Sequence, residues 1–148
     1  LMHFALQAVM RIGTGRSVYR QLPTELALAG KTGTSNDQRD SWFAGYSGDH
    51  LGVVWVGNDD NKPTTLTGSS GALTIWTDVF KHVETRSISQ TPPDTIDYFW
   101  IDPLNNLRSA EGCENAQIIR FIKGSEPTGK TNCDLISDPI SRWFKKLF

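Results

Sequence analysis

The fold of this chain is decided by the stretch LALAGKTGT at residues 26–34, where one Lys and two Thr follow an apolar run. We expect this stretch to form a β-strand, in which successive side chains alternate between two faces. Thr32 and Thr34 then share one face as hydroxyl donors, and Lys31 lies on the other face. Gly33 has no side chain, which lets another backbone come close. A charge, two hydroxyls and an open strand edge suit an anionic peptide that lies antiparallel to the strand.

Apolar periodicity predicts the elements on either side of that strand. We expect a helix over 1–12, strands over 41–46 and 51–57, and a second helix over 72–83. The near-continuous apolar run at 51–57 predicts that this third strand is buried on both faces. The order helix, strand, strand, strand, helix predicts an α/β (α+β) fold, in which an antiparallel sheet is sandwiched by helices.

The rest of the chain is expected to form a separate tail. A domain portion over 1–84 is followed by a Pro-containing linker over 85–95 and by a small β-rich module over 96–148. Strands are expected over 96–102 and near 117–122. Ser137-Asp138-Pro139 then opens a terminal amphipathic helix with a basic face, which packs on its own domain or lies on an anionic membrane surface.

Composition narrows the class of protein. The chain has 148 residues with 15 basic and 16 acidic side chains, so its near-neutral charge gives no argument for nucleic acid. It contains no run of about eighteen apolar residues that would span a membrane. Its first residues already read as a helix, so we expect that an upstream part of the protein is missing.

Cys113 and Cys133 are the two cysteines of the chain. A zinc site needs four ligands, and His3, His50 and His82 lie far away in sequence, so no metal site is expected. We favour a disulfide in an oxidising compartment over two unrelated buried thiols. The bridge would close a loop of about twenty residues and contribute about 3 kcal/mol in the chain-entropy model.

Residues 124–131, with the sequence GSEPTGKT, match the phosphate-loop pattern at every specified position. Such a loop must join a strand to a helix of a parallel sheet. Here Asn132-Cys133-Asp134 make a poor helix start, and Glu126 would place a negative charge beside the phosphates. We interpret the match as accidental, and a non-catalytic nucleotide-binding module using Gly124 to Thr131 stays as an alternative.

Lys31 cannot catalyse acyl transfer by itself. A nucleophilic Ser needs a base and an oxyanion hole, and one arrangement is Ser-x-x-Lys on a single helical turn. The chain has no Ser-x-x-Lys and no Ser-x-Asn. If Lys31 belongs to such a site, we expect the nucleophile and its base to lie upstream of Leu1.

Several motifs, in this order, resemble the transpeptidase domain of the bifunctional (class A) penicillin-binding proteins of Gram-negative type. They are GTG at 13–15, LAGKTGTS at 28–35, DSWFAGY at 40–46, VWVGND at 54–59, and Gly71-Ala72 with Trp76. The resemblance covers about residues 1–84. The tail is also similar to the family at 101–103 and 121–127.

The resemblance implies a chemistry. In these enzymes a Ser attacks a D-Ala-D-Ala peptide, releases D-Ala and passes the acyl group to an amine of a neighbouring peptide, and β-lactams acylate the same Ser. Lys31 would orient the Ser of a Ser-x-Asn motif and provide positive potential for the substrate carboxylate. The Thr32 and Thr34 hydroxyls would bind that carboxylate, the Thr34 N–H would donate to the oxyanion, and Gly33 would keep the strand edge open.

The resemblance also implies partners and a location. The partners are the upstream transpeptidase and glycosyltransferase parts of the same protein, peptidoglycan stem peptides, β-lactams, and an activator or division protein. No cofactor and no nucleic acid are implied. An upstream transmembrane helix would anchor the protein at the periplasmic face of the inner membrane, and this chain would be inactive alone. A serine β-lactamase-like hydrolase, which shares the Lys-Thr-Gly strand, is the rival interpretation, and the long tail argues against it.

Overall fold

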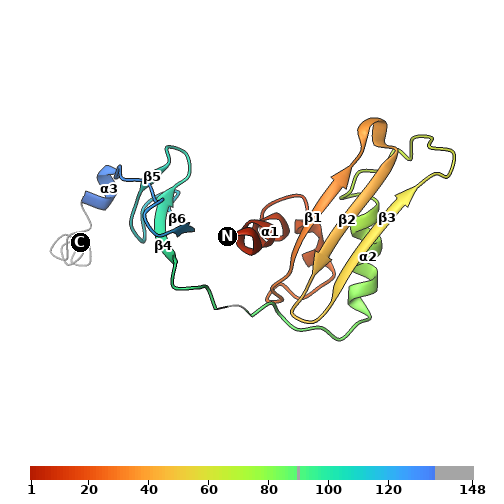
Figure 1. Cartoon of the computed structure of the whole chain (residues 1–148), viewed down its shortest axis with the longest axis horizontal. Coiled ribbons are helices and arrows are strands. Elements are labelled where there is room, and N and C mark those ends of the chain that lie inside the picture. The colour runs from red at the N-terminus through yellow and green to blue at the C-terminus, as the bar shows by residue number, and fades with distance from the viewer. Residues whose placement is uncertain (90, 136–148) are drawn as a thin grey trace. The chain divides into compact units, whose positions relative to one another are not determined.

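The computed structural model describes residues 1–89 and 91–135, and it divides the chain into two compact units, Leu1–Gln90 and Thr91–Phe148 (Figure 1). The first unit contains α1 (Met2–Arg11), η1 (Arg16–Arg20), β1 (Ala29–Thr34), η2 (Asn36–Gln38), β2 (Asp40–Tyr46), β3 (Leu51–Gly57) and α2 (Ala72–Lys81). Its three strands form an antiparallel sheet in the order β1-β2-β3. The predicted α+β class with an antiparallel sheet is confirmed.

The first strand is shorter than predicted, because it begins at Ala29 and not at Leu26. The carbonyl of Leu26 is used by side chains instead of by a strand ladder. It accepts a hydrogen bond from the Tyr19 hydroxyl at 2.9 Å and another from the Arg11 guanidinium at 3.2 Å. These contacts hold residues 26–28 as an extended approach to the strand, with Leu28 1% exposed in the core.

The hydrophobic core of the first unit lies between the sheet and α2. Its buried members are Met10, Val18, Leu22, Leu28, Phe43, Ala72, Leu73, Trp76 and Phe80. Trp76 is the largest of them and is 1% exposed. Its indole stacks on Phe80 with ring centroids 3.6 Å apart and meets Phe43 edge-on at 5.1 Å. Figure 1 shows α2 running behind β2 and β3.

The opposite face of the sheet is exposed along β3. Leu51 is 72% exposed, Val53 58% and Trp55 46%, whereas Val54 and Val56 pack against the core. The predicted burial of this strand on both faces is therefore wrong for the described residues. An unbroken apolar run looks the same in sequence whether one face or both faces of its strand are covered.

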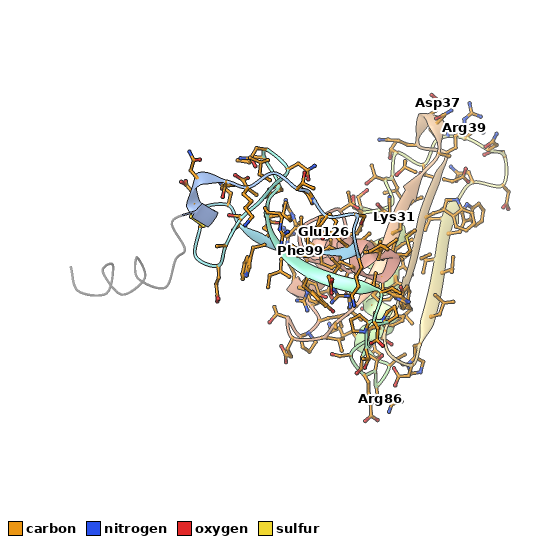
Figure 2. All side chains as sticks on the ribbon, turned by 60° about the vertical axis from the view of Figure 1, so that its left-hand side comes forward. Lys31, Asp37, Arg39, Arg86, Phe99 and Glu126 are labelled. Carbon is orange, nitrogen blue, oxygen red and sulfur yellow. A yellow bond between two sulfur atoms is a disulfide. The ribbon has the colours of Figure 1, made fainter. Side chains whose placement is uncertain are left out.

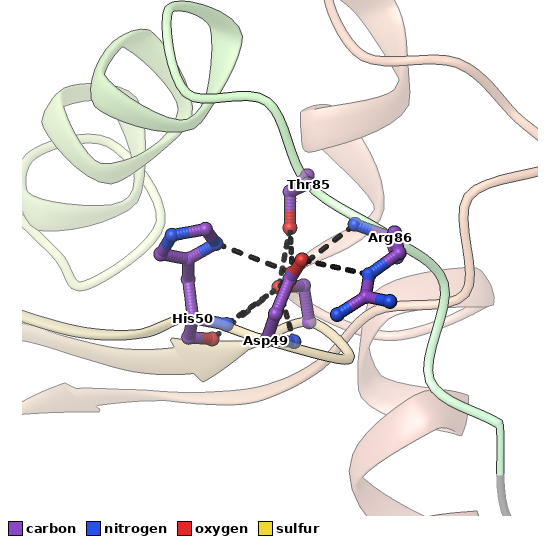
Figure 3. A network of polar contacts seen from close by, with 5 residues as sticks. Asp49, His50, Thr85 and Arg86 are labelled. Carbon is purple, nitrogen blue, oxygen red and sulfur yellow. Dashed lines mark hydrogen bonds and ion pairs between the residues drawn. The ribbon is translucent and has the colours of Figure 1, made fainter.

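The turn between β2 and β3 holds the segment that follows α2 (Figure 3). The Asp49 carboxylate accepts hydrogen bonds from the Thr85 hydroxyl at 2.8 Å and from the backbone N–H and Nε of Arg86, both at 3.1 Å. The Gly48 N–H donates to the Arg86 carbonyl at 2.8 Å. The predicted linker over 85–95 therefore begins with residues that are held on the first unit.

These contacts give the first unit a pH-dependent stability. Hydrogen bonds from the Arg86 backbone N–H and then the Thr85 hydroxyl hold the pKa of Asp49 well below its usual range. Because the folded-state pKa is lowered, the stabilisation is present above the unfolded pKa of about 3.9 and is lost as pH falls toward the folded-state pKa. We expect Asp49→Asn to lower the unfolding temperature at neutral pH, and the difference from wild type to shrink in acid.

Thermal unfolding followed by circular dichroism at about pH 7 and about pH 2 measures this difference. Asp59→Asn is the matched control, because it removes an exposed carboxylate of the same unit. An Asp49→Asn deficit of the same size at both pH values would contradict the assignment.

The second unit is a small antiparallel sheet. Its strands are β4 (Ile96–Asp102), β5 (Leu107–Arg108) and β6 (Gln117–Ile122), in the order β5-β4-β6, and α3 (Asn132–Leu135) follows. Strands were predicted over 96–102 and near 117–122 and both are present, whereas the two-residue β5 was not predicted. The predicted terminal helix from Ser137 lies outside the described residues. No helix in the described part of the chain has the length and apolar content needed to cross a bilayer.

A disulfide joins Cys113 to Cys133, which are 20 residues apart. The buried hydrophobic residues described in this unit are Ile101 and Ala110 alone, so its apolar core is thin. Closing a loop of this length contributes about 3 kcal/mol in the chain-entropy model, which is a large share of the stability of a small module.

We therefore expect reduction of the disulfide to unfold the second unit selectively. Native-state hydrogen exchange should show protection lost at β4 and β6 and retained at β1 to β3. The oxidised chain should also weigh two daltons less than the reduced chain. A Cys113→Ser/Cys133→Ser variant provides the same test without reductant. Unchanged protection in β4 and β6 would show that the sheet of this unit does not depend on the bridge.

Candidate active site

The predicted alternation of side chains along residues 31–34 is present in β1 (Figure 2 labels Lys31). Thr32 lies opposite Phe43 and Thr34 lies opposite Ser41, both buried residues of β2. Residues directly opposite in an antiparallel pair point to the same face, so the two Thr share the face that carries the core. Lys31 lies on the other face. The shared face of the two hydroxyls is therefore confirmed.

Both hydroxyls have partners that leave a proton for a ligand. The Thr34 hydroxyl accepts a hydrogen bond from the Gly68 N–H at 2.9 Å, so its own proton is not used in that bond. The hydroxyl of Thr32 lies 2.7 Å from the hydroxyl of Thr14. Either hydroxyl can be the donor in that contact, and when Thr14 donates, the proton of Thr32 is left for a ligand. Two such donors on one strand face can hold a carboxylate.

The turn before α2 fixes the position of Thr34. A Cβ at Gly68 would lie 2.6 Å from the carbonyl oxygens of Gly33 and Trp42, so only glycine lets this turn pack on the two strands. Ser41 is fully buried, donates to the Thr67 carbonyl at 2.8 Å and accepts the Ala72 N–H at 2.9 Å. The turn is thus attached to β1 and β2 from both of its ends.

Sequence reasoning gave no site role to Thr14, Ser41 or Gly68. Each contacts its partner across a long separation, from 18 residues for Thr14 and Thr32 to 34 for Gly68 and Thr34. The one local signal was the run GSSG at 68–71 directly before a helix. Such a run predicts a tight approach of backbones, but it does not tell which strand is approached.

Lys31 and Gly33 lie where a bound peptide has access. Lys31 is exposed, and its ammonium donates to the neighbouring Thr32 carbonyl at 2.7 Å. A Cβ at Gly33 would lie 3.2 Å from the Cβ of Trp42, so a side chain there would crowd the strand. In the described part of the chain, β1 has a strand partner on one side only. These features supply positive charge and leave a strand edge for an extended ligand.

The described residues contain no cluster of His, Cys, Asp and Glu that could hold a metal ion. Among the described residues, the Lys31 ammonium donates its hydrogen bond to the Thr32 carbonyl, and no Ser hydroxyl contacts it. The site as described can bind an anion and donate hydrogen bonds. It does not by itself present an activated nucleophile.

The phosphate-loop match at residues 124–131 has a different structure. It follows β6 of an antiparallel sheet and not a strand of a parallel one. The Glu126 carboxylate accepts the Gly124 N–H at 2.8 Å, so an acidic side chain takes a backbone donor of the loop. The expectation that residues 132–134 make a poor helix start is wrong, since α3 begins at Asn132, but its four residues are too short for a phosphate-binding helix.

Comparisons with known proteins agree with this geometry. No family model matches the chain. The chain is 36% identical over 145 residues to penicillin-binding protein 1B of Vibrio cholerae, which covers 98% of the chain and 18% of that protein. It is 43% identical over 99 residues to penicillin-binding protein 1B of Haemophilus influenzae, covering 67% of the chain and 12% of that protein. The crystal structure of penicillin-binding protein 1A from Haemophilus influenzae matches with a TM-score of 0.74 at 26% identity, over 86% of this chain and 20% of that one.

The fold and the Lys-Thr-Gly-Thr edge strand thus define an α+β unit of the penicillin-binding type. The chain is homologous to the class A penicillin-binding proteins 1A and 1B of Gram-negative bacteria over most of its length, which confirms the resemblance found in the sequence. It spans between 12% and 18% of the two 1B relatives.

Proposed function

We propose that this chain forms one wall of a serine DD-transpeptidase site that cross-links peptidoglycan. The observation that carries the proposal is the pair of hydroxyl donors, Thr32 and Thr34, on one face of an edge strand that also carries Lys31. A carboxylate at the end of a peptide fits this pair, because the Thr34 hydroxyl keeps its proton and the Thr32 hydroxyl keeps its own when Thr14 is the donor between them. The homology to penicillin-binding proteins supports the same proposal.

Each residue then has a role in acyl transfer. The substrate carboxylate accepts hydrogen bonds from Thr32 and Thr34. The ammonium of Lys31 orients the Ser of a Ser-x-Asn motif and adds positive potential. A nucleophilic Ser attacks the carbonyl of the D-Ala-D-Ala bond, and the Thr34 N–H is one donor to the oxyanion that forms. D-Ala leaves with the nitrogen of the broken bond, and the acyl group passes from the Ser to an amine of a neighbouring peptide.

The proposal extends to the whole protein. The nucleophilic Ser, its Lys base and a glycosyltransferase part would lie upstream in the same protein, with a transmembrane helix that anchors it at the periplasmic face of the inner membrane. Stem peptides and β-lactams would bind at the site, and an activator or division protein would bind elsewhere. The chemistry described needs no cofactor. The 148 residues alone would then be inactive.

Labelling the full-length protein with a fluorescent penicillin tests the proposal. We expect one covalent adduct, and peptide mass spectrometry should place it on a Ser outside these 148 residues. Excess unlabelled penicillin added first is the control for specific acylation. An adduct on a Ser within the chain, or no adduct on folded protein, would overturn the proposal.

A further inference from the structure

An open cavity of about 550 Å³ is lined by residues between 12 and 20 and by the turn before α2. Its polar lining consists of Thr14, Arg16, Ser17, Arg20, Ser69 and Ser70. No Asp or Glu belongs to the lining. The residues that line the cavity therefore carry two guanidinium groups and four hydroxyls, which are the groups that bind oxyanions.

The two guanidinium groups have no acidic partner among the described residues of the first unit. Arg16 and Arg20 are both exposed on η1, and neither makes an ion pair, hydrogen bond or ring contact with another residue of 1–89, the described part of the first unit. Other cations of this unit do have partners, such as Arg39 with Asp37 at 3.3 Å and Arg86 with Asp49 at 3.1 Å (Figure 2 labels these Arg residues). Two unpaired positive charges at one concave site attract an anion.

The cavity is connected to the candidate active site through two of its lining residues. Thr14 lines the cavity, and its hydroxyl lies 2.7 Å from that of Thr32. Ser69 lines it too, and directly follows Gly68, whose N–H binds the Thr34 hydroxyl at 2.9 Å. A ligand held by the two Thr hydroxyls therefore has the cavity next to it.

We propose that Arg16 and Arg20 form an anion subsite, which takes a second carboxylate of an anionic peptide bound along β1. The peptide part of this inference rests on the proposed function, whereas the anion site rests on the cavity alone. Ile12 also lines the cavity and is 72% exposed, which gives an apolar wall for the methylene groups that carry a side-chain carboxylate. Carboxylate and phosphate would both bind here as oxyanions, because guanidinium groups pair with either of them.

Binding to the 148-residue chain is measured by NMR from the backbone amide signals of Gly13, Thr14, Ser69 and Ser70. The probes are glutarate as a dicarboxylate, glutaramide as its uncharged counterpart, and inorganic phosphate. We expect saturable shifts with glutarate and none with glutaramide. Arg16→Gln/Arg20→Gln should weaken glutarate binding at least about tenfold, because two charge-assisted contacts are lost. Added salt should weaken binding in the wild-type chain.

Lys62→Gln/Lys81→Gln is the matched control, because it removes two exposed charges of the same unit outside the cavity lining. Glutarate affinity should be unchanged in this variant. The inference is overturned if glutarate gives no saturable shift, if glutaramide binds as well, or if both double variants weaken binding equally. Tighter binding of phosphate than of glutarate, dependent on both Arg residues, would overturn the carboxylate assignment.

The outcomes separate this inference from the proposed function. If penicillin acylates the full-length protein but glutarate does not bind, the anion subsite is ruled out and the transpeptidase proposal stands. Arg-dependent glutarate binding without acylation would leave an anion site and remove the transpeptidase proposal.

Discussion

Replacing Lys31 with Ala is expected to slow penicillin acylation of the full-length protein by about 10²- to 10³-fold, which is the size of effect seen when one charge-stabilising group leaves a preorganised site. Lys31 is exposed on β1, so its removal leaves no buried group without a partner. Its ammonium supplies the positive charge on the strand that carries Thr32 and Thr34. The measurement is the second-order rate of label incorporation from a fluorescent penicillin.

Lys81→Ala is the control for this prediction, since it removes an exposed Lys at the end of α2, away from β1. Both variants should keep the circular dichroism spectrum and unfolding temperature of the wild type. Acylation of Lys31→Ala at the wild-type rate, in a folded protein, would show that this ammonium has no part in the reaction.

Thr32→Val should also slow acylation, because it removes one carboxylate donor and keeps the shape of the side chain.

Local patterns predicted the elements of this fold well, because each depends on a few neighbouring residues. The alternation around Lys31 placed Thr32 and Thr34 on one face, and the register of β1 with β2 bears this out. Periodicity also identified α2, whose buried residues recur at helical spacing. These features are set by backbone geometry that a short stretch of sequence already determines.

Contacts between distant residues could not be predicted in the same way. Asp49 binds Arg86 across 37 residues, and Gly68 binds Thr34 across 34. The cavity with Arg16 and Arg20 forms only when η1 and the turn before α2 come together. Such contacts are fixed by the packing of whole elements, which no local pattern encodes.

The largest expected effect on stability is that of Trp76→Ala, which should destabilise the first unit by about 3 to 5 kcal/mol. The indole is 1% exposed, stacks on Phe80 and meets Phe43 edge-on. Its Nε1 also donates to the Gly52 carbonyl at 3.1 Å. Denaturant unfolding of the chain measures the loss, and Ile75→Ala is the control, because that neighbour on α2 is 47% exposed. A loss no larger than that of Ile75→Ala would contradict the central place of this indole in the core.

The sheet leaves space for this indole where two of its residues have no side chain. Gly45 and Gly52 lie directly opposite each other on β2 and β3. A Cβ at Gly45 would lie 2.5 Å from a ring carbon of Phe43 and 3.0 Å from an indole carbon of Trp76, and one at Gly52 would lie 2.8 Å from the indole Nε1. Gly45 therefore leaves room for the rings of Phe43 and Trp76, whereas the nearest ring to Gly52 is that of Trp76, so the effects of Gly52 and Trp76 should be coupled.

A double-mutant cycle measures that coupling. Gly52→Ala should destabilise the wild-type chain, because its new methyl group presses on the indole. In the Trp76→Ala background the same methyl group enters the space that the indole has left, and the destabilisation should be smaller. An equal cost of Gly52→Ala in both backgrounds would show that the glycine is needed for the strand and not for the ring. The fit between the Trp76 indole and Gly52 would then not explain how α2 is held against β2 and β3.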